Sequence, residues 1–294
     1  MLVTNSIEIC MFGRKRRNCL LTWLTDVSDN HVCHTGITVQ HGVVPPIEQS
    51  RWQHIFHCDH LWNLYRIGRR EILVVQSPVD PTTPKAIATF KPYRQRVELV
   101  INQSERAEGI TDYRESPEEV VDPLGLVLRL VLMNWAARNQ AMLIHACAVL
   151  DGTDSYVFAG HSTDGKSTIA RVWMDDGKVI GSEILLLTKD NEDYYVYGIP
   201  LHCHNAVTSL QRMKVNKIFF IRHSPSNQIA RVGVAGAASA LLARCFAPRW
   251  DKNSMEATTD LTGHVTNDIP CYNLGFVPDR SVVSFLRTHS EVDA

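Results

Sequence analysis

The sequence predicts an α/β protein in which a smaller β-rich region, residues 1–115, precedes a larger domain, residues 116–294. Three observations predict this class. Strand-length apolar runs alternate with helical segments throughout the second part, which is typical of α/β domains. The first part consists of short β-branched or alternating runs that prolines separate. In the second part, one apolar strand leads through a glycine-bearing loop directly into a helix.

Composition and charge exclude several classes of protein. Of the 294 residues, 45% are hydrophobic and 21% are charged, so the chain can bury a core and is not disordered throughout. The net charge is −1 and the tryptophans do not alternate with basic clusters, which argues against nucleic-acid binding. No apolar run approaches the roughly 18 residues that a membrane span needs. We therefore expect neither a nucleic-acid partner nor a membrane partner.

The cysteines and the N-terminal segment favour a cytoplasmic protein. The eight cysteines are spread over the chain without a CxxC pair, which is typical of thiols in a reducing compartment. The basic run 14–17 is followed by an apolar patch that is too short for a signal peptide. We interpret this run as a solvated surface feature. A patch that binds phosphate or a leader peptide is the alternative.

The first elements follow from local patterns. Residues 71–75, 85–90 and 96–101 are strand-length runs, and the polar stretch 102–115 is the candidate linker.

A long and largely buried helix should open the second part. Ser116 can cap it, Pro117 fits its first turn, and the acidic residues that follow suit the positive end of the helix dipole. Asp122 and Pro123 offer a second start, so we expect a kink or a restart there before the helix ends near Asn139.

Strands and helices then alternate to the end of the chain. Predicted helices begin near Lys166, span residues 235–246, and follow Asp279, which should cap the last one. Apolar or β-branched runs predict the strands. These strands cover residues 142–150, 155–159, 178–187, 194–197, 217–221 and 269–276.

The loop before Lys166 carries the most specific motif of the sequence. Residues 160–167 match G-x-x-x-x-G-K-[ST], with a strand before them and a helix after them, which is the context of a phosphate-binding P-loop. We predict that its backbone amides bind nucleotide phosphates at the positive end of the helix. The predicted nucleotide-binding residues are Gly160, His161, Ser162, Thr163, Asp164, Gly165, Lys166, Ser167 and Thr168.

The residues of this loop have separate predicted tasks. Gly160 and Gly165 allow backbone conformations that aim several N–H groups at one anion. Lys166 supplies a cation for the β- and γ-phosphates, and Ser167 presents a hydroxyl to Mg²⁺. Because a carboxylate repels phosphates, the side chain of Asp164 should point away from them. The alternative is a glycine-rich turn that ends in a surface lysine.

Two residues of neighbouring predicted strands complete the candidate site. Glu183 is a lone acid in the apolar run 178–187, where an unpaired carboxylate is costly, so Mg²⁺ or a lysine should lie near it. We predict that Glu183 holds the metal or activates an attacking hydroxyl; a solvated glutamate on an edge strand is the alternative. His145 lies in the apolar strand 142–150, where a histidine of the core is the alternative to a functional one.

With these residues in place, the sequence resembles the catalytic domain of the HPr kinase/phosphorylase family, and it is most similar to the HPr-kinase-like enzymes of peptide-modifying gene clusters, including lasso-peptide tailoring kinases. The resemblance covers about residues 124–287. It rests on His145, on the loop that ends in Lys166 and on the acidic strand after it. Residues 198–200 and 269–274 resemble a Gly-x-Pro step and a Pro-x-Tyr-x-Leu strand of those relatives.

This resemblance implies a P-loop kinase fold of the HPr kinase C-terminal type. It implies catalytic roles for His145, Lys166 and Glu183, with His145 assisting the carboxylate. Ser167 and Glu183 are the implied ligands of Mg²⁺. In this family the carboxylate is the first of an Asp-Asp pair. A gapless count from Lys166 puts Glu183 on the first acid, a shift by one puts it on the second, and either way one acid is absent.

The function implied is transfer of a phosphoryl group from ATP, with Mg²⁺, to a serine hydroxyl. The acceptor implied is a peptide or a small carrier protein; we prefer a peptide, modified in the tailoring of a ribosomal peptide and recognised by residues 1–115. The missing acid keeps a second function open, a nucleotide-binding module with weak or no transferase activity. The resemblance further implies that a homo-oligomer can form.

Histidines and cysteines also gather elsewhere in the chain, at residues 54–60 and 202–204. Imidazole and thiolate suit Zn²⁺, but neither group has the paired spacing of a structural zinc site. Aromatic residues alternate with the first group, so we expect ordinary packing there, with a zinc protein or metal-dependent hydrolase as the alternative. The second group follows the Gly-x-Pro step and is a candidate for lining the acceptor cleft.

Overall fold

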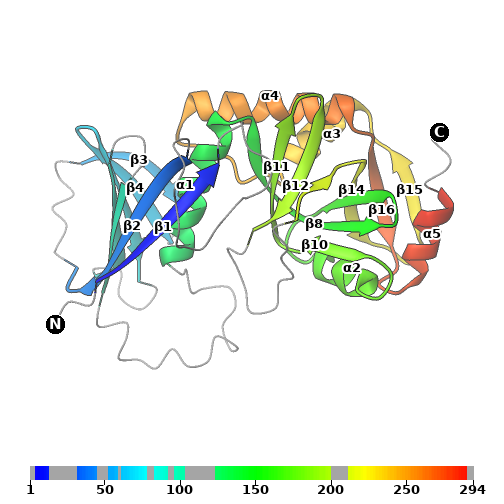
Figure 1. Cartoon of the computed structure of the whole chain (residues 1–294), viewed down its shortest axis with the longest axis horizontal. Coiled ribbons are helices and arrows are strands. Elements are labelled where there is room, and N and C mark those ends of the chain that lie inside the picture. Colours follow the sequence, from blue (N-terminus) through cyan, green and yellow to red (C-terminus); the bar gives the residue numbers. More distant parts are fainter. Residues whose placement is uncertain are drawn as a thin grey trace. The chain divides into compact units, whose positions relative to one another are not determined.

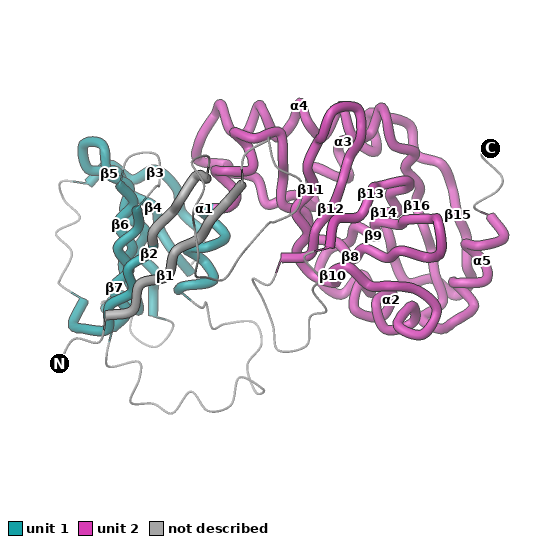
Figure 2. The backbone as a smooth tube through the Cα atoms, in the orientation of Figure 1, with its two compact units in different colours: residues 1–131 teal, residues 132–294 magenta. Residues whose placement is uncertain are grey.

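The computed structural model describes eight parts of the chain, which belong to two compact units, Met1–Val131 and Leu132–Ala294 (Figure 2). The described residues are 4–12, 32–44, 52–58, 61–77, 83–91, 96–102, 123–199 and 211–289. The expected boundary between residues 115 and 116, the helix start at Ser116 and the basic run 14–17 lie outside them. The prediction of a mixed α/β protein with a β-rich N-terminal region is confirmed.

The first unit is built around a seven-stranded sheet with the order β1-β2-β7-β6-β5-β4-β3. Its strands are β1 (Thr4–Phe12), β2 (Val32–Gly42), β3 (Gln53–Cys58), β4 (Trp62–Ile67), β5 (Arg70–Gln76), β6 (Pro84–Phe90) and β7 (Arg96–Asn102). The three strands predicted individually correspond to β5, β6 and β7. In β7, Val97 and Leu99 are buried and alternate with exposed Arg96 and Glu98, as in a sheet with one covered face.

The second unit holds a nine-stranded sheet with the order β13-β12-β11-β8-β9-β14-β16-β15, in which β10 also pairs with β8. Helix α1 (Pro123–Arg138) precedes this sheet, begins at the predicted restart and contains the division between the units. The other elements are β8 (Ala141–Asp151), β9 (Asp154–Ala159), α2 (Lys166–Trp173), β10 (Lys178–Gly181), β11 (Ile184–Asp190), β12 (Asp193–Gly198), β13 (Met213–Lys214), β14 (Lys217–His223), β15 (Gln228–Arg231), α3 (Val234–Leu242), α4 (Lys252–Asp268), β16 (Cys271–Phe276) and α5 (Ser281–His289). Among the described residues, no helix is both long and apolar enough to cross a membrane.

Helices cover both faces of this second sheet (Figure 1). In β8, the even-numbered residues from Met142 to Ala148 are buried with α3 and α4, whereas Cys147 and Val149 are buried with α2 and α5. Because side chains of a strand alternate between the faces, His145 lies on the α2 face. Strand β9 pairs with β8 and, in parallel, with β14, so β9 and β14 point their carboxyl ends to the same edge.

The single strand expected over residues 178–187 is wrong. Two strands, β10 and β11, pair with β8 one after the other, and Ser182 and Glu183 lie between them. Ile180 and Leu185 are both buried in the cluster that contains α3 and α4. Their odd separation would put them on opposite faces of an unbroken strand, so an irregularity is required. The shift in register between β10 and β8 supplies it.

Two helices also differ from the prediction. The helix expected over residues 235–246 ends at Leu242 in α3, because residues 244–246 hydrogen-bond to β8 instead. Helix α4 has no counterpart among the predicted helices, since its threonines have low helix propensity. The hydroxyls of Thr258 and Thr262 donate to backbone carbonyls one turn earlier, and Leu261 and Val265 are buried against the sheet. Packing therefore overrides local propensity in α4.

Helix α5 is capped as predicted and is tied to the β8–β9 turn by an ion pair. Asp279 accepts a hydrogen bond from the amide of Ser281 at 2.8 Å. Arg287 donates hydrogen bonds to Asp151 at 2.7 and 2.8 Å, and they hold the pKa of Asp151 below its ordinary value of 3.8. The Asp151 side chain is only 9% exposed, so this pair is better shielded from water than a typical surface pair.

Replacing Arg287 with methionine is expected to lower the free energy of unfolding by about 1 kcal/mol at neutral pH. Because the folded pKa of Asp151 is lowered, its carboxylate contributes stability above the unfolded pKa and loses it as the pH falls through the folded pKa. The difference in the free energy of unfolding between variant and parent should therefore shrink as the pH falls below 3.8. Urea unfolding of both proteins above and below this pH measures this difference. A difference that stays constant would assign the effect to contacts of Arg287 that do not titrate, such as its packing and its hydrogen bond to the carbonyl of Asp176.

Candidate functional site

A loop between β9 and α2 forms one wall of the candidate site. Strand β9 ends at Ala159, the amide of Gly160 donates to the carbonyl of His145 at 3.2 Å, and α2 begins at Lys166. Gly165 precedes the helix in the left-handed conformation, with φ +101°. The strand, loop and helix expected around residues 160–167 are therefore present. The first amides of a helix lack intrahelical partners and can bind an anion.

Two residues of this loop, Thr163 and Gly165, have a left-handed backbone conformation. A Cβ atom at Gly165 would lie 2.6 Å from Cζ of Phe276 and 2.9 Å from the ring of His223, so a larger residue would displace them. Thr163 has φ +72°, which is unusual for a β-branched residue. Conformations of this kind are found at functional sites, where the surrounding structure holds them.

Replacing Gly165 with alanine is expected to cost about 1–2 kcal/mol of stability for the left-handed backbone alone. The displacement of Phe276 and His223 adds to this cost and distorts the loop, so anion binding should be lost as well. Gly152→Ala is the matched control, because Gly152 has φ +62° but no atom lies within 4 Å of the position that its new methyl group would take. Chemical unfolding compares the two variants, and equal losses would contradict a steric role for Gly165.

Lys166 is a buried cation at the start of α2. Its side chain reaches back over the loop, where Nζ donates to the carbonyl of His161 at 2.7 Å, and the residue is 5% exposed. Burial lowers the pKa of Lys166 below its ordinary value of 10.5, and the negative charges of Glu183 and Asp164 partly offset this effect. A buried ammonium group is costly unless an anion accompanies it. An anion that enters beside Lys166 would therefore be strongly favoured.

The carboxylate of Asp164 turns into the loop itself. Its Oδ2 atom accepts a hydrogen bond from the amide of His161 at 2.6 Å. The carbonyl of His161 meanwhile accepts from Lys166, so both backbone groups of His161 have partners within the loop. This placement agrees with the expectation that the side chain of Asp164 points away from a bound anion.

Glu183 and His145 form a hydrogen-bonded pair. Nε2 of His145 lies 2.8 Å from Oε1 of Glu183, and since an ionised carboxylate only accepts, the imidazole donates. Ile184 pairs with His145 in register, so the break between β10 and β11 puts Glu183 beside the imidazole. The Glu183 side chain is 36% exposed and remains reachable from solvent. A carboxylate oriented in this way can accept a proton from an incoming group.

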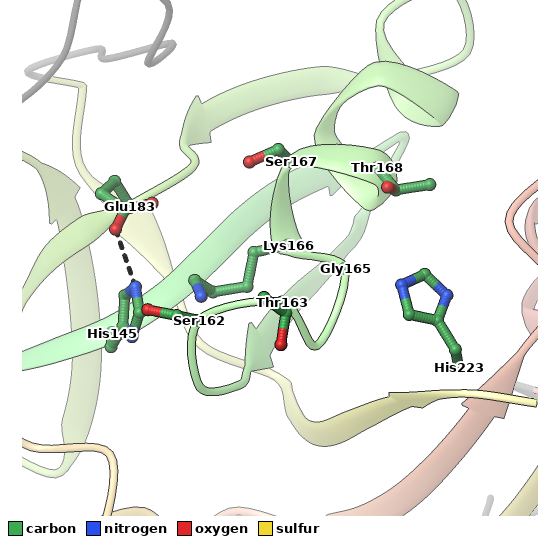
Figure 3. Close-up of a pocket in the computed structure, with 9 residues that line it drawn as sticks. All are labelled: His145, Ser162, Thr163, Gly165, Lys166, Ser167, Thr168, Glu183 and His223. Carbon is green, nitrogen blue, oxygen red and sulfur yellow. Dashed lines mark hydrogen bonds and ion pairs between the residues drawn. The ribbon is translucent and has the colours of Figure 1, made fainter. Parts of the chain in front are cut away.

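One pocket of about 300 Å³ brings the loop and this pair together (Figure 3). Glu183 and His145 lie on one side of Lys166, and His223 lies on the other side. The lining residues are His145, Ser162, Thr163, Gly165, Lys166, Ser167, Thr168, Glu183 and His223. The other predicted loop residues, Gly160, His161 and Asp164, are not among them.

Both predicted ligands of Mg²⁺ line this pocket, the hydroxyl of Ser167 and the carboxylate of Glu183. This set suits Mg²⁺, which is commonly held by one or two protein oxygens together with phosphates and water. Among the described residues, no group of three or more His, Cys, Asp or Glu side chains could hold a metal by itself.

His223 and Arg244 lie beside the loop but have no counterpart among the predicted site residues. His223 is the last residue of β14, two residues beyond the predicted end of this strand at residue 221. The sequence feature that could have identified it is its place at the carboxyl end of a strand that pairs with β9, because ligands bind at this edge of α/β sheets. The carbonyl of Arg244 accepts from the amide of His145 at 2.8 Å. Burial lowers the pKa of Arg244, and Asp164 opposes this effect. No local pattern indicates Arg244, because only the turn after α3 brings it there.

His54 and His57 of the first unit are engaged in local contacts. Asn63 Oδ1 lies 3.3 Å from Nε2 of His54 and 2.8 Å from Nδ1 of His57. His54 also packs edge-on against Tyr65, with the ring centroids 5.3 Å apart. These contacts favour packing over metal binding in this group. His60 and residues 202–204 lie outside the described residues.

No model of a known protein family matches the chain, and a search of curated proteins finds no match. The class of protein is therefore defined by the fold and the pocket. The second unit is an α/β domain in which a glycine-rich loop, a buried lysine and a carboxylate–imidazole pair line one cavity.

Proposed function

We propose that this protein is an ATP- and Mg²⁺-dependent kinase of the HPr kinase type, which transfers the γ-phosphoryl group to a serine hydroxyl of a peptide or small carrier protein. The observation that supports it most is the shared pocket, in which the buried Lys166 and the Glu183–His145 pair line one cavity. An anion site next to a proton acceptor provides the two functions that phosphoryl transfer needs.

In the proposed reaction, the loop amides and Lys166 bind the triphosphate, and the serine enters on the side of Glu183. The serine oxygen forms a bond to the γ-phosphorus while the bond from that phosphorus to the β,γ-bridging oxygen breaks, and ADP leaves. The serine proton passes to the carboxylate of Glu183. The Nε2–H group of His145 holds this carboxylate in position.

Mg²⁺ bound here would neutralise part of the phosphate charge, which favours the transfer step. Ser167 and Glu183 are the residues that would hold it. The same loop would bind the phosphates next to it, because Lys166 adds a positive charge inside the pocket.

A nucleotide-binding module with weak or no transferase activity is the second candidate. One observation favours it: among the described residues that line the pocket, Glu183 is the only carboxylate. Kinases commonly use different residues to hold the metal and to accept the proton. A protein with one acid for both tasks could bind the nucleotide and release it unchanged.

The two candidates are separated by incubating the full chain with ATP, Mg²⁺ and a library of peptides that each contain one serine. Mass spectrometry should find a phosphate adduct on some of these peptides and none on matched peptides with alanine in place of serine. ATP binding without an adduct on any peptide would overturn the kinase proposal in favour of the binding module. A protein that binds no nucleotide would overturn both.

A further inference from the structure

We propose that His223 is the surface on which the base of the donor nucleotide stacks. The nucleoside then lies on the side of the pocket opposite Glu183 and extends past the carboxyl end of β14. This inference rests on the proposed function, because it takes the ligand of the loop to be a nucleoside triphosphate. It specifies how the protein binds the base of the donor nucleotide, which the loop motif alone does not indicate.

The position of His223 follows from the pairing of two parallel strands. Phe220 of β14 pairs with Ala159, the last residue of β9, and β14 then continues to His223 alongside the loop. Ligands of open α/β sheets bind outside the carboxyl ends of parallel strands. His223 is exposed and lines the pocket, so it is accessible to a ligand that extends from the loop.

The imidazole of His223 is held in place by neighbours on two sides. His223 pairs in register with Phe276 of β16, and the ring centroids are 5.0 Å apart with an interplanar angle of 34°. Phe276 is fully buried, so the imidazole is the outer ring of an aromatic pair whose inner ring belongs to the core. The imidazole also closely approaches the backbone of Gly165. A ring held in this way loses little freedom when a ligand stacks on it.

The arrangement of the pocket gives the triphosphate its direction. The γ-phosphoryl group must lie beside Glu183, the proposed proton acceptor, and Lys166 lies between Glu183 and His223 (Figure 3). The phosphates therefore run along the loop from Glu183 towards His223. Thr168 faces the same side of the pocket as His223, so the nucleoside end emerges between these two residues.

Stacking on an imidazole does not distinguish between purines. Every base has a π-face, so the strength of base–aromatic stacking depends little on which base is bound. A cavity of about 300 Å³ is at the lower end of ligand pockets, so it encloses the phosphates and leaves the base at its rim, on His223. We expect ATP and GTP to bind with affinities within a few-fold of each other.

Calorimetry on the full chain tests this inference with two ligands, ATP and inorganic triphosphate, each with Mg²⁺. His223→Ala should weaken ATP binding roughly tenfold and leave inorganic triphosphate binding unchanged, because only ATP has a base to stack. His223→Phe should restore the affinity for ATP, since phenylalanine keeps the aromatic face without the N–H groups. His264→Ala is the control, an exposed histidine on α4 that should change neither affinity.

Three outcomes would overturn the inference. Equal weakening of both ligands by His223→Ala would mean that the imidazole contacts phosphate. Unchanged ATP affinity in His223→Ala, or no rescue by His223→Phe, would exclude stacking. The proposed kinase activity is tested separately from the stacking surface. If His223→Ala selectively loses ATP affinity but the parent protein transfers no phosphoryl group, the stacking surface is supported and the kinase activity is rejected.

Discussion

Lys166→Met is expected to lower the affinity for ATP by roughly 100- to 1,000-fold while the free energy of unfolding stays the same or rises. Each charge-assisted hydrogen bond from the ammonium group to phosphate contributes about 1.5–3 kcal/mol, and about 1.4 kcal/mol corresponds to a tenfold change. The stability of the empty protein should not fall, because the variant removes a buried charge whose pKa burial already lowers. Calorimetry and urea unfolding measure the two effects.

The opposite signs of these effects distinguish a ligand-binding lysine from a structural one. Lys252→Met is the control, because the Lys252 side chain on α4 is 86% exposed and should affect neither quantity. A Lys166→Met protein that unfolds more easily would mean that the hydrogen bond to His161 stabilises the loop by itself. Retained affinity for ATP would exclude the loop as the phosphate site.

Glu183→Gln is expected to slow phosphoryl transfer by roughly 100- to 10,000-fold, with the affinity for ATP changed no more than a few-fold. Glutamine has the shape of glutamate, and its carbonyl oxygen can still accept the hydrogen bond from His145, so the geometry of the pair is kept. What the amide loses is the ability to take the serine proton. Single-turnover transfer to a serine peptide and calorimetry with ATP separate the two quantities.

The matched control for this variant is Glu256→Gln on α4, where the side chain is 60% exposed and pairs only weakly with Lys252 at 3.7 Å. It should transfer phosphate at the parent rate. Full activity in Glu183→Gln would exclude Glu183 as the proton acceptor. A large loss of ATP affinity in the presence of Mg²⁺, absent without it, would mean that the carboxylate of Glu183 acts mainly as a ligand of Mg²⁺ and not as the proton acceptor.

The elements that could be predicted from the sequence are those with a strong local pattern. Strands β5 to β9 have alternating or apolar runs of strand length, and α5 has a capping aspartate, Asp279. The predictions were wrong where distant contacts decide the local conformation. The break between β10 and β11 exists because Ile180 and Leu185 share one core, and α4 is helical although its threonines disfavour a helix.

The residues of the candidate site also fall into those that a local pattern predicts and those that distant contacts bring together. The spacing of Gly165, Lys166 and Ser167 is local, and so the loop with its flanking strand and helix follows from sequence alone. Glu183 and His145 stand out in the sequence as polar residues in apolar runs, but their contact depends on the pairing of β8 with β11. The pattern of residues within either segment does not predict the register in which β8 and β11 pair.

By itself, the sequence determined that a glycine-rich loop joins a buried strand to a helix with Lys166 at its start, because turn and helix signals act over a few residues. Only the tertiary structure decided what faces this loop. The hydrogen bond between Glu183 and His145 and the position of His223 beside Gly165 both arise from strand pairing between segments far apart in the chain. Such pairing is selected by burial of the whole core, which no single segment encodes.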